Sequence, residues 1–324
     1  MQKEKRTMRI SGFVFCALAS ACAGNEALGG DLSVLLEAED SITEGIASGT
    51  EADNIQDGWA VSFDKYIVTI GTVRVRFSTD ETLQAKAADV FVVDLTQVPA
   101  AGLLLWRLEG LREGRWEFFY ATPGAAGATR HNSVSQKDYE AMVAGDLTYF
   151  VDGVLTKADG QSCPPAALSS PGGKAPNGNT SGGNACYDAS AIRFTFGATA
   201  KTAFGPCEID EVPGFAIAGK QTVAATIHGD HLYFNGFPEG DEGGTRRLAQ
   251  WWADCDLNLD GTVTTGELKA IMPAQLPEID ERFQLGGATV APLDDMYTYV
   301  IAQLKTQGHF QGEGECPLDG KAHE

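Results

Sequence analysis

The sequence predicts an α+β fold that is mainly β, with an antiparallel β-sandwich body followed by a helical segment near the C-terminus. Three observations support this fold class. Short runs in which apolar and polar residues alternate, the pattern of half-buried strands, recur between residues 59 and 235. Helical spacing of apolar residues is concentrated after residue 245. Hydrophobic residues make up 43% of the 324-residue chain, which is enough to form a substantial core.

Short apolar segments follow one another at the intervals that antiparallel sandwiches use. Between 72 and 77 apolar and polar residues alternate strictly, which predicts a half-buried strand, and Gly71 marks a bend before it. In order along the chain, the predicted strands are 32–36, 59–63, 66–70, 73–77, 90–95, 103–106, 116–120, 147–151, 192–196 and 221–234.

Residues 58–121 carry three loose motifs in succession. They are V-x-I-x-x-V-x-V at Val68–Val75, V-D-L at Val93–Leu95 and L-x-x-G-x-W at Leu111–Trp116. With these motifs the segment resembles the opening of a bacterial exported β-sandwich family of unknown function. The resemblance implies a transthyretin-like or carbohydrate-binding-like sandwich and transfers no active site.

Two further segments are predicted to be helices, and a third is predicted to be a loop. Residues 135–145 predict a short helix with Ser135 as its N-cap. Residues 293–304 carry an apolar stripe, with Pro292 suited to the first turn, and predict the last helix. Residues 158–185 are rich in Gly, Pro, Ser and Asn, and predict a flexible surface insertion.

These assignments divide the chain into successive segments. The predicted segments are a signal peptide (1–21), a lipidated N-terminus with an acidic tether and first strand (22–57), the β-sandwich (58–235), a calcium-loop segment with its docking helix (240–310) and a tail (311–324).

The N-terminus predicts export. Basic residues precede a short apolar run, Ile10–Ala21, which is too short to span a bilayer and is typical of a signal peptide. Small residues directly before Cys22 resemble a bacterial lipobox, whose cysteine is lipidated and becomes the mature N-terminus. Ala19 stands where that family usually has Leu, so an ordinary signal peptide cut nearby is the alternative. Because Ala23 rather than Asp follows the cysteine, the resemblance implies a lipoprotein anchored in the outer membrane.

The charge balance narrows the range of partners. The formal net charge is −20, which argues against binding to nucleic acid because little positive charge is present to neutralise phosphates. The expected partners are the membrane, through the lipid anchor, and a protein or glycan that the sequence does not identify.

Seven cysteines are present, and five of them lie beyond the signal peptide and the lipobox. An odd number leaves at least one cysteine without an intramolecular partner, and Cys255, on an apolar helical face, is expected to be a buried thiol. An exported chain can keep disulfides. We expect Cys163 to pair with Cys186 across the Gly/Pro-rich insertion. Cys207 would then pair with Cys316 in the tail, although four cysteines allow three connectivities.

Residues 256–267 have the spacing of a twelve-residue calcium loop. Short oxygen-bearing side chains stand at loop positions 1, 3 and 5, and Gly261 at position 6 permits a sharp turn. Position 7 offers a backbone carbonyl, position 9 a place for a bridging water, and the glutamate at position 12 is long enough to bind with both oxygens. The expected ligands are Asp256, Asn258, Asp260, Thr262, Thr264 and Glu267.

Apolar residues at helical spacing flank this loop on both sides, from Thr245, suited to an N-cap, to Pro273. With its flanks, the segment 245–272 resembles an EF-hand, a helix–loop–helix unit that binds Ca²⁺. In an exported chain the resemblance implies a structural clamp or a low-affinity calcium sensor. A solvated acidic turn, or a loop that has lost its ion, is the alternative.

A second group of residues, His228, Asp230 and His231, has side chains that could bind a transition metal. His228 and Asp230 would share one face of a predicted strand, and a bulge at Gly229 would let His231 join them. Two imidazoles and a carboxylate are suited to Zn²⁺, Cu²⁺ or iron, of which Zn²⁺ and Cu²⁺ are the expected ions. The T-I-H-G-D-H-L stretch, a single EF-hand and the G-E-G-x-C stretch at Gly312–Cys316 resemble uncharacterised bacterial lipoproteins with no assigned chemistry. His309 is a further residue able to complete such a site, and a purely structural role of the histidines is the alternative.

The sequence contains no Gly-x-Ser-x-Gly elbow, phosphate loop or dinucleotide fingerprint, so it favours a binding protein over an enzyme. Three hypotheses remain open. The first is a calcium-binding lipoprotein, the second a transition-metal binder or metalloenzyme, and the third a glycan- or protein-binding surface module.

Overall fold

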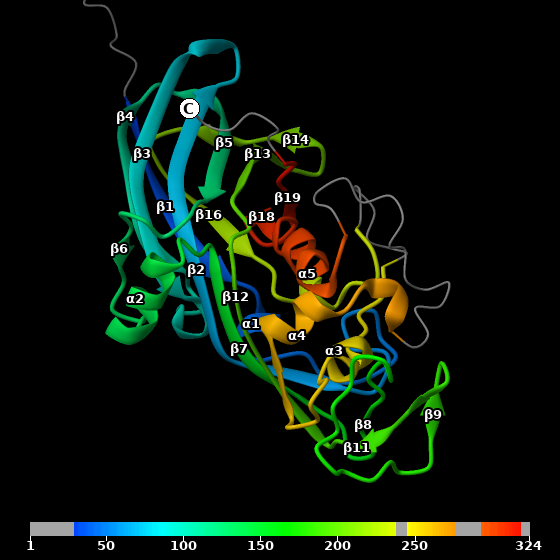
Figure 1. Cartoon of the computed structure of the whole chain (residues 1–324). Coiled ribbons are helices and arrows are strands. Elements are labelled where there is room, and N and C mark those ends of the chain that lie inside the picture. Colours follow the sequence, from blue (N-terminus) through cyan, green and yellow to red (C-terminus); the bar gives the residue numbers. More distant parts are fainter. Residues whose placement is uncertain (1–28, 238–244, 277–292, 319–324) are drawn as a thin grey trace, which may run out of the picture.

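A long strand, β2 (Ala60–Phe77), runs through the middle of the fold (Figure 1). The computed structural model describes residues 29–237, 245–276 and 293–318. The other strands are β1 (Gly30–Ala38), β3 (Asp80–Asp94), β4 (Leu103–Leu111), β5 (Gly114–Thr122), β6 (Thr129–Arg130), β7 (Tyr149–Thr156), β8 (Gln161–Ser162), β9 (Thr180–Ser181), β10 (Asn184–Ala185), β11 (Tyr187–Asp188), β12 (Ala191–Ala198), β13 (Thr202–Ile209), β14 (Val212–Pro213), β15 (Phe215–Ile217), β16 (Lys220–Ile227), β17 (Thr262–Thr264), β18 (Gly308–Phe310) and β19 (Gly314–Glu315). The helices are α1 (Asp40–Thr43), α2 (Gln136–Ala144), α3 (Gln250–Asp254), α4 (Thr265–Ala270) and α5 (Met296–Leu304), with 3-10 turns at Leu95–Gln97, Asp230–Tyr233 and Pro273–Gln275.

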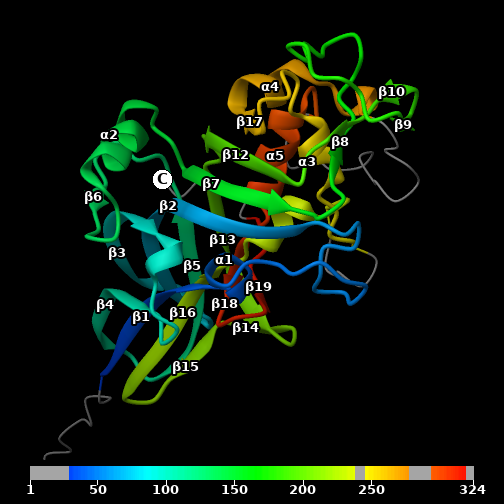
Figure 2. The same ribbon diagram turned by 90° about the horizontal axis from the view of Figure 1, so that it is seen from below.

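Fifteen of the described strands form one large mixed sheet whose order is β17-β12-β7-β2-β5-β13-β19-β18-β16-β1-β4, with β3 beside β2. The short strands β8 and β11, and β9 and β10, form two separate two-stranded sheets. Most neighbours are antiparallel, whereas β1–β16, β12–β17 and β3–β6 are parallel. The sheet folds back on itself, so that β1 and β16 lie across from β2 and β7 (Figure 2). The prediction of an α+β fold that is mainly β is therefore confirmed.

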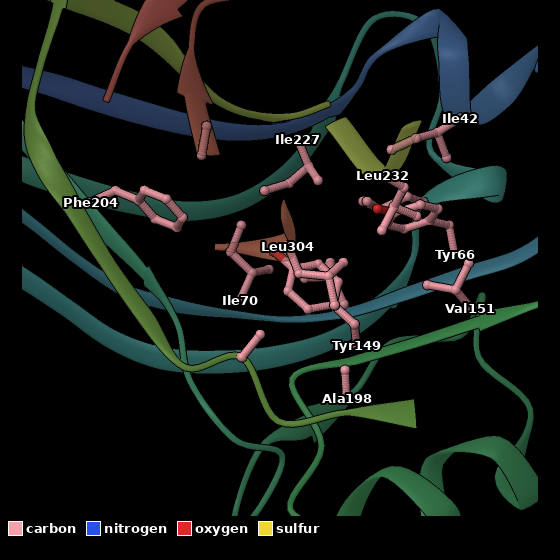
Figure 3. Close-up of a cluster of buried hydrophobic side chains, with 14 of the residues drawn as sticks. Ile42, Tyr66, Ile70, Tyr149, Val151, Ala198, Phe204, Ile227, Leu232 and Leu304 are labelled. Atoms are coloured by element: carbon pink, nitrogen blue, oxygen red, sulfur yellow. The ribbon is translucent and has the colours of Figure 1, made fainter. Parts of the chain in front are cut away.

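The main apolar core lies between these two parts of the sheet. Ile70 of β2, Tyr149 of β7 and Ile227 of β16 point toward one another there, and Leu304 of α5 reaches into the same cluster (Figure 3). All four side chains are fully buried, and burial of a large apolar side chain stabilises a fold by about 1.5–3 kcal/mol. The core therefore connects α5 directly to both parts of the sheet.

Helix α2 covers the opposite face of β2 and β3. Met142 of α2 packs there in a small separate core with Ile67 of β2 and Val92 of β3. The hydroxyl of Ser135 accepts a hydrogen bond from the Asp138 N–H, which is the N-cap expected from the sequence.

The helices α3, α4 and α5 gather at the other side of the sheet, beside β12 (Figures 1 and 2). The predicted helix from Thr245 is shorter than expected. Helix α3 begins at Gln250, because the Asp57 carboxylate accepts hydrogen bonds from the N–H groups of Ala249 and Gln250 at 2.7 and 2.8 Å. Helix α5 packs against α4, and the Met296 N–H donates to the Ile271 carbonyl at 2.8 Å.

Two disulfides connect distant parts of the chain, and both were expected from the sequence. Cys163 pairs with Cys186, and Cys207 of β13 pairs with Cys316. Cys255 is a buried free thiol, as its apolar helical position predicts, and burial raises its pKa well above the ordinary range.

The predicted signal peptide and lipidation site at Cys22 lie outside the described residues. Within the described ranges, no helix combines the length and the apolar character that a membrane crossing requires.

Candidate metal centres

The backbone amides of the 256–267 loop hold its acidic side chains in place. The two carboxylate oxygens of Asp256 accept hydrogen bonds from the N–H groups of Asp260 and Gly261, at 3.1 and 2.9 Å. The Asn258 side-chain oxygen also accepts from the Asp260 N–H, at 2.8 Å, and Asp260 accepts from the Thr262 N–H at 2.9 Å. Gly261 has a positive φ of 86°, a conformation that favours glycine, so the turn needs this residue.

Glu267 bridges the two ends of the loop. One of its carboxylate oxygens accepts from the Leu257 N–H at 3.1 Å, and the other accepts from the N–H and hydroxyl of Thr264, both at 2.9 Å. The Thr264 hydroxyl in turn caps α4. The carboxylate at loop position 12 is therefore turned back over the loop that begins at Asp256.

The loop is also joined to the sheet. Its short strand β17 pairs in parallel with β12, with Thr262 opposite Arg193, and the Arg193 N–H donates to the Gly261 carbonyl at 2.8 Å. In a strand the N–H and C=O of one residue point to the same side. Because the Thr262 N–H faces Asp260 within the loop, the Thr262 carbonyl faces the loop interior as well.

The electrostatics of the loop disfavour three unscreened carboxylates. Burial, together with repulsion from Glu267 and Asp260, raises the pKa of Asp256 to about 6, although the loop amides act in the opposite direction. A cation among these oxygens would remove the repulsion. The Gly/Pro-rich insertion lies against the same region, since the Ser170 N–H donates to the Leu257 carbonyl at 2.8 Å.

The second group of predicted ligands lies at the end of β16. The expected strand 221–234 is shorter than predicted, because β16 ends at Ile227 and a 3-10 turn follows. Gly229 is not a strand bulge. A Cβ atom built there would lie 2.5 Å from the Ile42 side chain, so glycine is needed for close packing. The turn, rather than strand alternation, places His228, Asp230 and His231 near one another.

His231 is fixed by a hydroxyl from the segment after α5. Its Nδ1 lies 2.8 Å from the Thr306 hydroxyl, which itself donates to the Gln303 carbonyl. Since that hydroxyl proton is used, Nδ1 of His231 is the donor in this pair. The neutral ring then carries its lone pair on Nε2, the nitrogen that faces His309.

His309, on β18, completes a cluster of three imidazoles. Its Nε2 lies 3.3 Å from Nε2 of His231, with the two rings nearly perpendicular. The ring of His228 stacks on that of His309 with centroids 3.8 Å apart. One ring nitrogen from each of the three histidines lies within 4.8 Å of the others, and all three side chains are buried.

His228 also belongs to a second group, with Glu39 and Asp230. Its Nε2 lies 3.1 Å from the Gly312 carbonyl, which can only accept, so Nε2 carries the proton and Nδ1 the lone pair. Nδ1 is 3.9 Å from the Glu39 carboxylate. The Asp230 oxygen Oδ2 is paired with the Arg247 guanidinium, with Nε at 2.7 Å. In the part of the chain that the structure describes, Oδ1 of Asp230 is buried without a hydrogen-bond partner.

Burial controls the protonation of this region. It lowers the pKa of His231 well below the ordinary range, with further contributions from His228 and Arg247. Burial and the two neighbouring imidazoles lower the pKa of His309 to about 2. Burial and the Asp230 charge raise the pKa of Glu39 to about 7. At neutral pH, His231 and His309 are therefore neutral, the form in which an imidazole binds a metal.

The sequence identified His228, Asp230 and His231, and the structure brings His309 and Glu39 to them. His309 was noticed only as a residue able to complete the site, because β18 pairs with β16 over a separation of about eighty residues. Glu39 was missed, since it was assigned to an acidic tether. It lies directly after β1, whose parallel pairing with β16 has no signature in the local sequence.

Comparisons of the chain with models of known protein families, with curated proteins and with solved structures found no match. The two candidate centres therefore rest on their geometry and chemistry alone.

Proposed function

We propose that this chain is an exported calcium-binding lipoprotein in which Ca²⁺ in the 256–267 loop clamps the C-terminal third onto the sheet. The observation that carries the proposal is the arrangement of Glu267, whose carboxylate joins Leu257 to Thr264 and lies close enough to Asp256 to raise its pKa. Hard dications prefer such oxygen ligands, and a carboxylate at position 12 closes the cage in loops of this spacing.

Contacts from the loop support a clamp rather than a switch. In paired calcium motifs the loop strand has a second loop as its neighbour, whereas here β17 pairs with β12 of the main sheet. The loop continues into α4, and α4 packs against α5. The Tyr297 hydroxyl of α5 donates to the Gly197 carbonyl of β12 at 2.8 Å. Helix α5 is therefore bonded to the same strand that pairs with β17.

Calcium binding would stabilise the native state by mass action. Loops of extracellular modules bind with dissociation constants on the order of 10⁻⁴–10⁻³ M, so millimolar calcium would keep such a site largely filled. Millimolar calcium is about one to ten times such a dissociation constant, which adds roughly 0.4–1.4 kcal/mol to the free energy of unfolding. This is a measurable part of the roughly 5–15 kcal/mol that stabilises an ordinary domain.

Calcium titration by calorimetry tests the proposal. We expect one Ca²⁺ per chain for the native protein, and a loss of affinity of at least about 100-fold in Glu267→Gln, because the neutral amide removes the closing charge. Glu140→Gln, a charge-matched change on the exposed face of α2, is the control and should bind as the native chain does. Absence of binding heat in the native protein, or equal affinities of Glu267→Gln and the control, would reject the calcium site.

Export is supported by a different observation. Two disulfides, with all four cysteines buried, fit a chain that matures in an oxidising compartment. Lipidation at Cys22 predicts that cells fed a tagged fatty acid label the native chain and Cys16→Ser, but leave Cys22→Ser unlabelled. Equal labelling of both variants would remove the anchor from the proposal. The expectation of a glycan- or protein-binding surface stays a prediction.

A further inference from the structure

We infer that His228, His231 and His309 form a buried three-imidazole site for a late first-row divalent cation, Zn²⁺ or Cu²⁺. This site is separate from the calcium loop in residues and in chemistry, since imidazole nitrogens suit these metals whereas calcium prefers oxygen. Its ligands come from the end of β16, from the 3-10 turn and from β18.

The spacing of two of the imidazoles matches a shared metal ion. Nε2 of His231 and Nε2 of His309 are 3.3 Å apart. Two nitrogens bound to one tetrahedral zinc ion at about 2.0–2.1 Å lie roughly 3.3 Å from each other. Because the two rings are nearly perpendicular, at 84°, their in-plane lone pairs can converge on one point. His228 supplies the third nitrogen of the same group, and because its ring stacks on that of His309 at 14°, it must turn about its side-chain bonds to direct its lone pair at the ion.

Hydrogen bonds to the outer ring nitrogens orient two of the ligands. His231 donates from Nδ1 to the Thr306 hydroxyl, and His228 donates from Nε2 to the Gly312 carbonyl. Metal-binding histidines almost always have such a partner, which fixes the tautomer and the ring. In each ring the nitrogen opposite the hydrogen bond is the one that carries the lone pair.

The negative charge that a bound dication needs lies beside His228. Three neutral imidazoles leave the full charge of the ion uncompensated. Asp230 is 2% exposed, and its Oδ2 is paired with the Arg247 guanidinium, whereas its Oδ1 makes no hydrogen bond within the described residues. Leaving a carboxylate oxygen buried without a partner is costly, so Oδ1 is an acceptor that a cation beside His228 would satisfy. Glu39, partly exposed, adds a second carboxylate at the same ring.

Binding of Zn²⁺ and Cu²⁺, each tested alone, examines the inference on the full chain. After treatment with chelator, the native protein should take up one Zn²⁺ or one Cu²⁺ per chain, measured by elemental analysis and competition titration. Nitrogen couplings in the Cu²⁺ electron paramagnetic resonance spectrum should report three imidazoles. His309→Ala should reduce the number of coupled nitrogens to two. It should also lower the metal affinity by more than about 100-fold, because it removes a ligand, and losing only a hydrogen bond to a ligand already costs about 10–100-fold.

A near-isosteric variant keeps the inference testable if His309→Ala does not fold. Thr306→Val removes the hydroxyl that orients His231 and leaves all three imidazoles, so we expect affinity to fall by about 10–100-fold. His131→Ala, at a half-buried histidine that bonds Ser133 and is not a member of the three-imidazole group, is the control and should bind normally. Absence of uptake, or affinity unchanged in both His309→Ala and Thr306→Val, would overturn the inference. Glu267→Gln should retain the Zn²⁺ stoichiometry, so this site and the calcium site can fail independently.

Discussion

Removing the Cys207–Cys316 disulfide should lower the free energy of unfolding by roughly 5 kcal/mol, the expected entropic effect of a cross-link that closes a loop of about 110 residues. The double variant Cys207→Ala, Cys316→Ala should also weaken Zn²⁺ or Cu²⁺ binding. Cys316 directly follows β19, and β19 pairs with both β13 and β18, the strand that carries His309. Gly312, the hydrogen-bond partner of His228, lies in the connection between β18 and β19.

The other disulfide provides the matched control. Cys163 and Cys186 are separated by 23 residues, so their replacement should cost roughly 3 kcal/mol. Cys163 lies in the 158–185 insertion and Cys186 directly follows it, so neither belongs to β18 or β19. Chemical denaturation measures both losses, and competition titration measures the metal affinities of the folded variants. Equal metal affinity in the two double variants would contradict the role of β18 and β19 in holding His309.

Trp252→Ala should lower the free energy of unfolding by about 3–5 kcal/mol, the range found when a large buried aromatic side chain is removed. Trp252 is fully buried on α3 and stacks on Phe196 of β12 with centroids 5.6 Å apart. It also packs on Phe194 of β12 and on Trp251. Because α3 leads directly into the loop that begins at Asp256, calcium affinity should fall together with stability.

Trp252→Phe is the appropriate comparison, since it keeps an aromatic ring against β12 and should lose less. Denaturation in calcium and in chelator gives the stability of each variant with and without ligand. If Trp252→Ala costs less than about 1 kcal/mol, the contact between α3 and β12 does not hold this region as described.

Local patterns predicted the main strands and α2 because alternation, caps and turn residues are properties of neighbouring positions. The predicted strands 59–63, 66–70 and 73–77 are one strand, β2. Its pairing with β3 shifts at Gly71–Val73, and Thr72 there has a positive φ of 51°. The strand β13 was not predicted, since Gly205 and Pro206 interrupt its apolar pattern.

The two candidate centres differ in how far the sequence could reveal them. All proposed ligands of the candidate calcium loop lie within twelve residues, so their spacing in the sequence is enough to predict them. The histidine centre combines β1, β16 and β18, and its proximity depends on pairings between distant strands. The apolar residues after Asp230 also suggested a longer strand, whereas packing of Gly229 against Ile42 ends β16 and starts the 3-10 turn.

Amide hydrogen exchange with and without Ca²⁺ tests the calcium clamp most directly. At calcium about 100 times the dissociation constant, amides of β12, α3 and α4 that open together with the loop should exchange up to about 100-fold more slowly. Amides of β4, at the far edge of the sheet, should not change. The same protection should be absent in Glu267→Gln. Exchange in β12, α3 and α4 that is unaffected by calcium in the native chain would contradict the account.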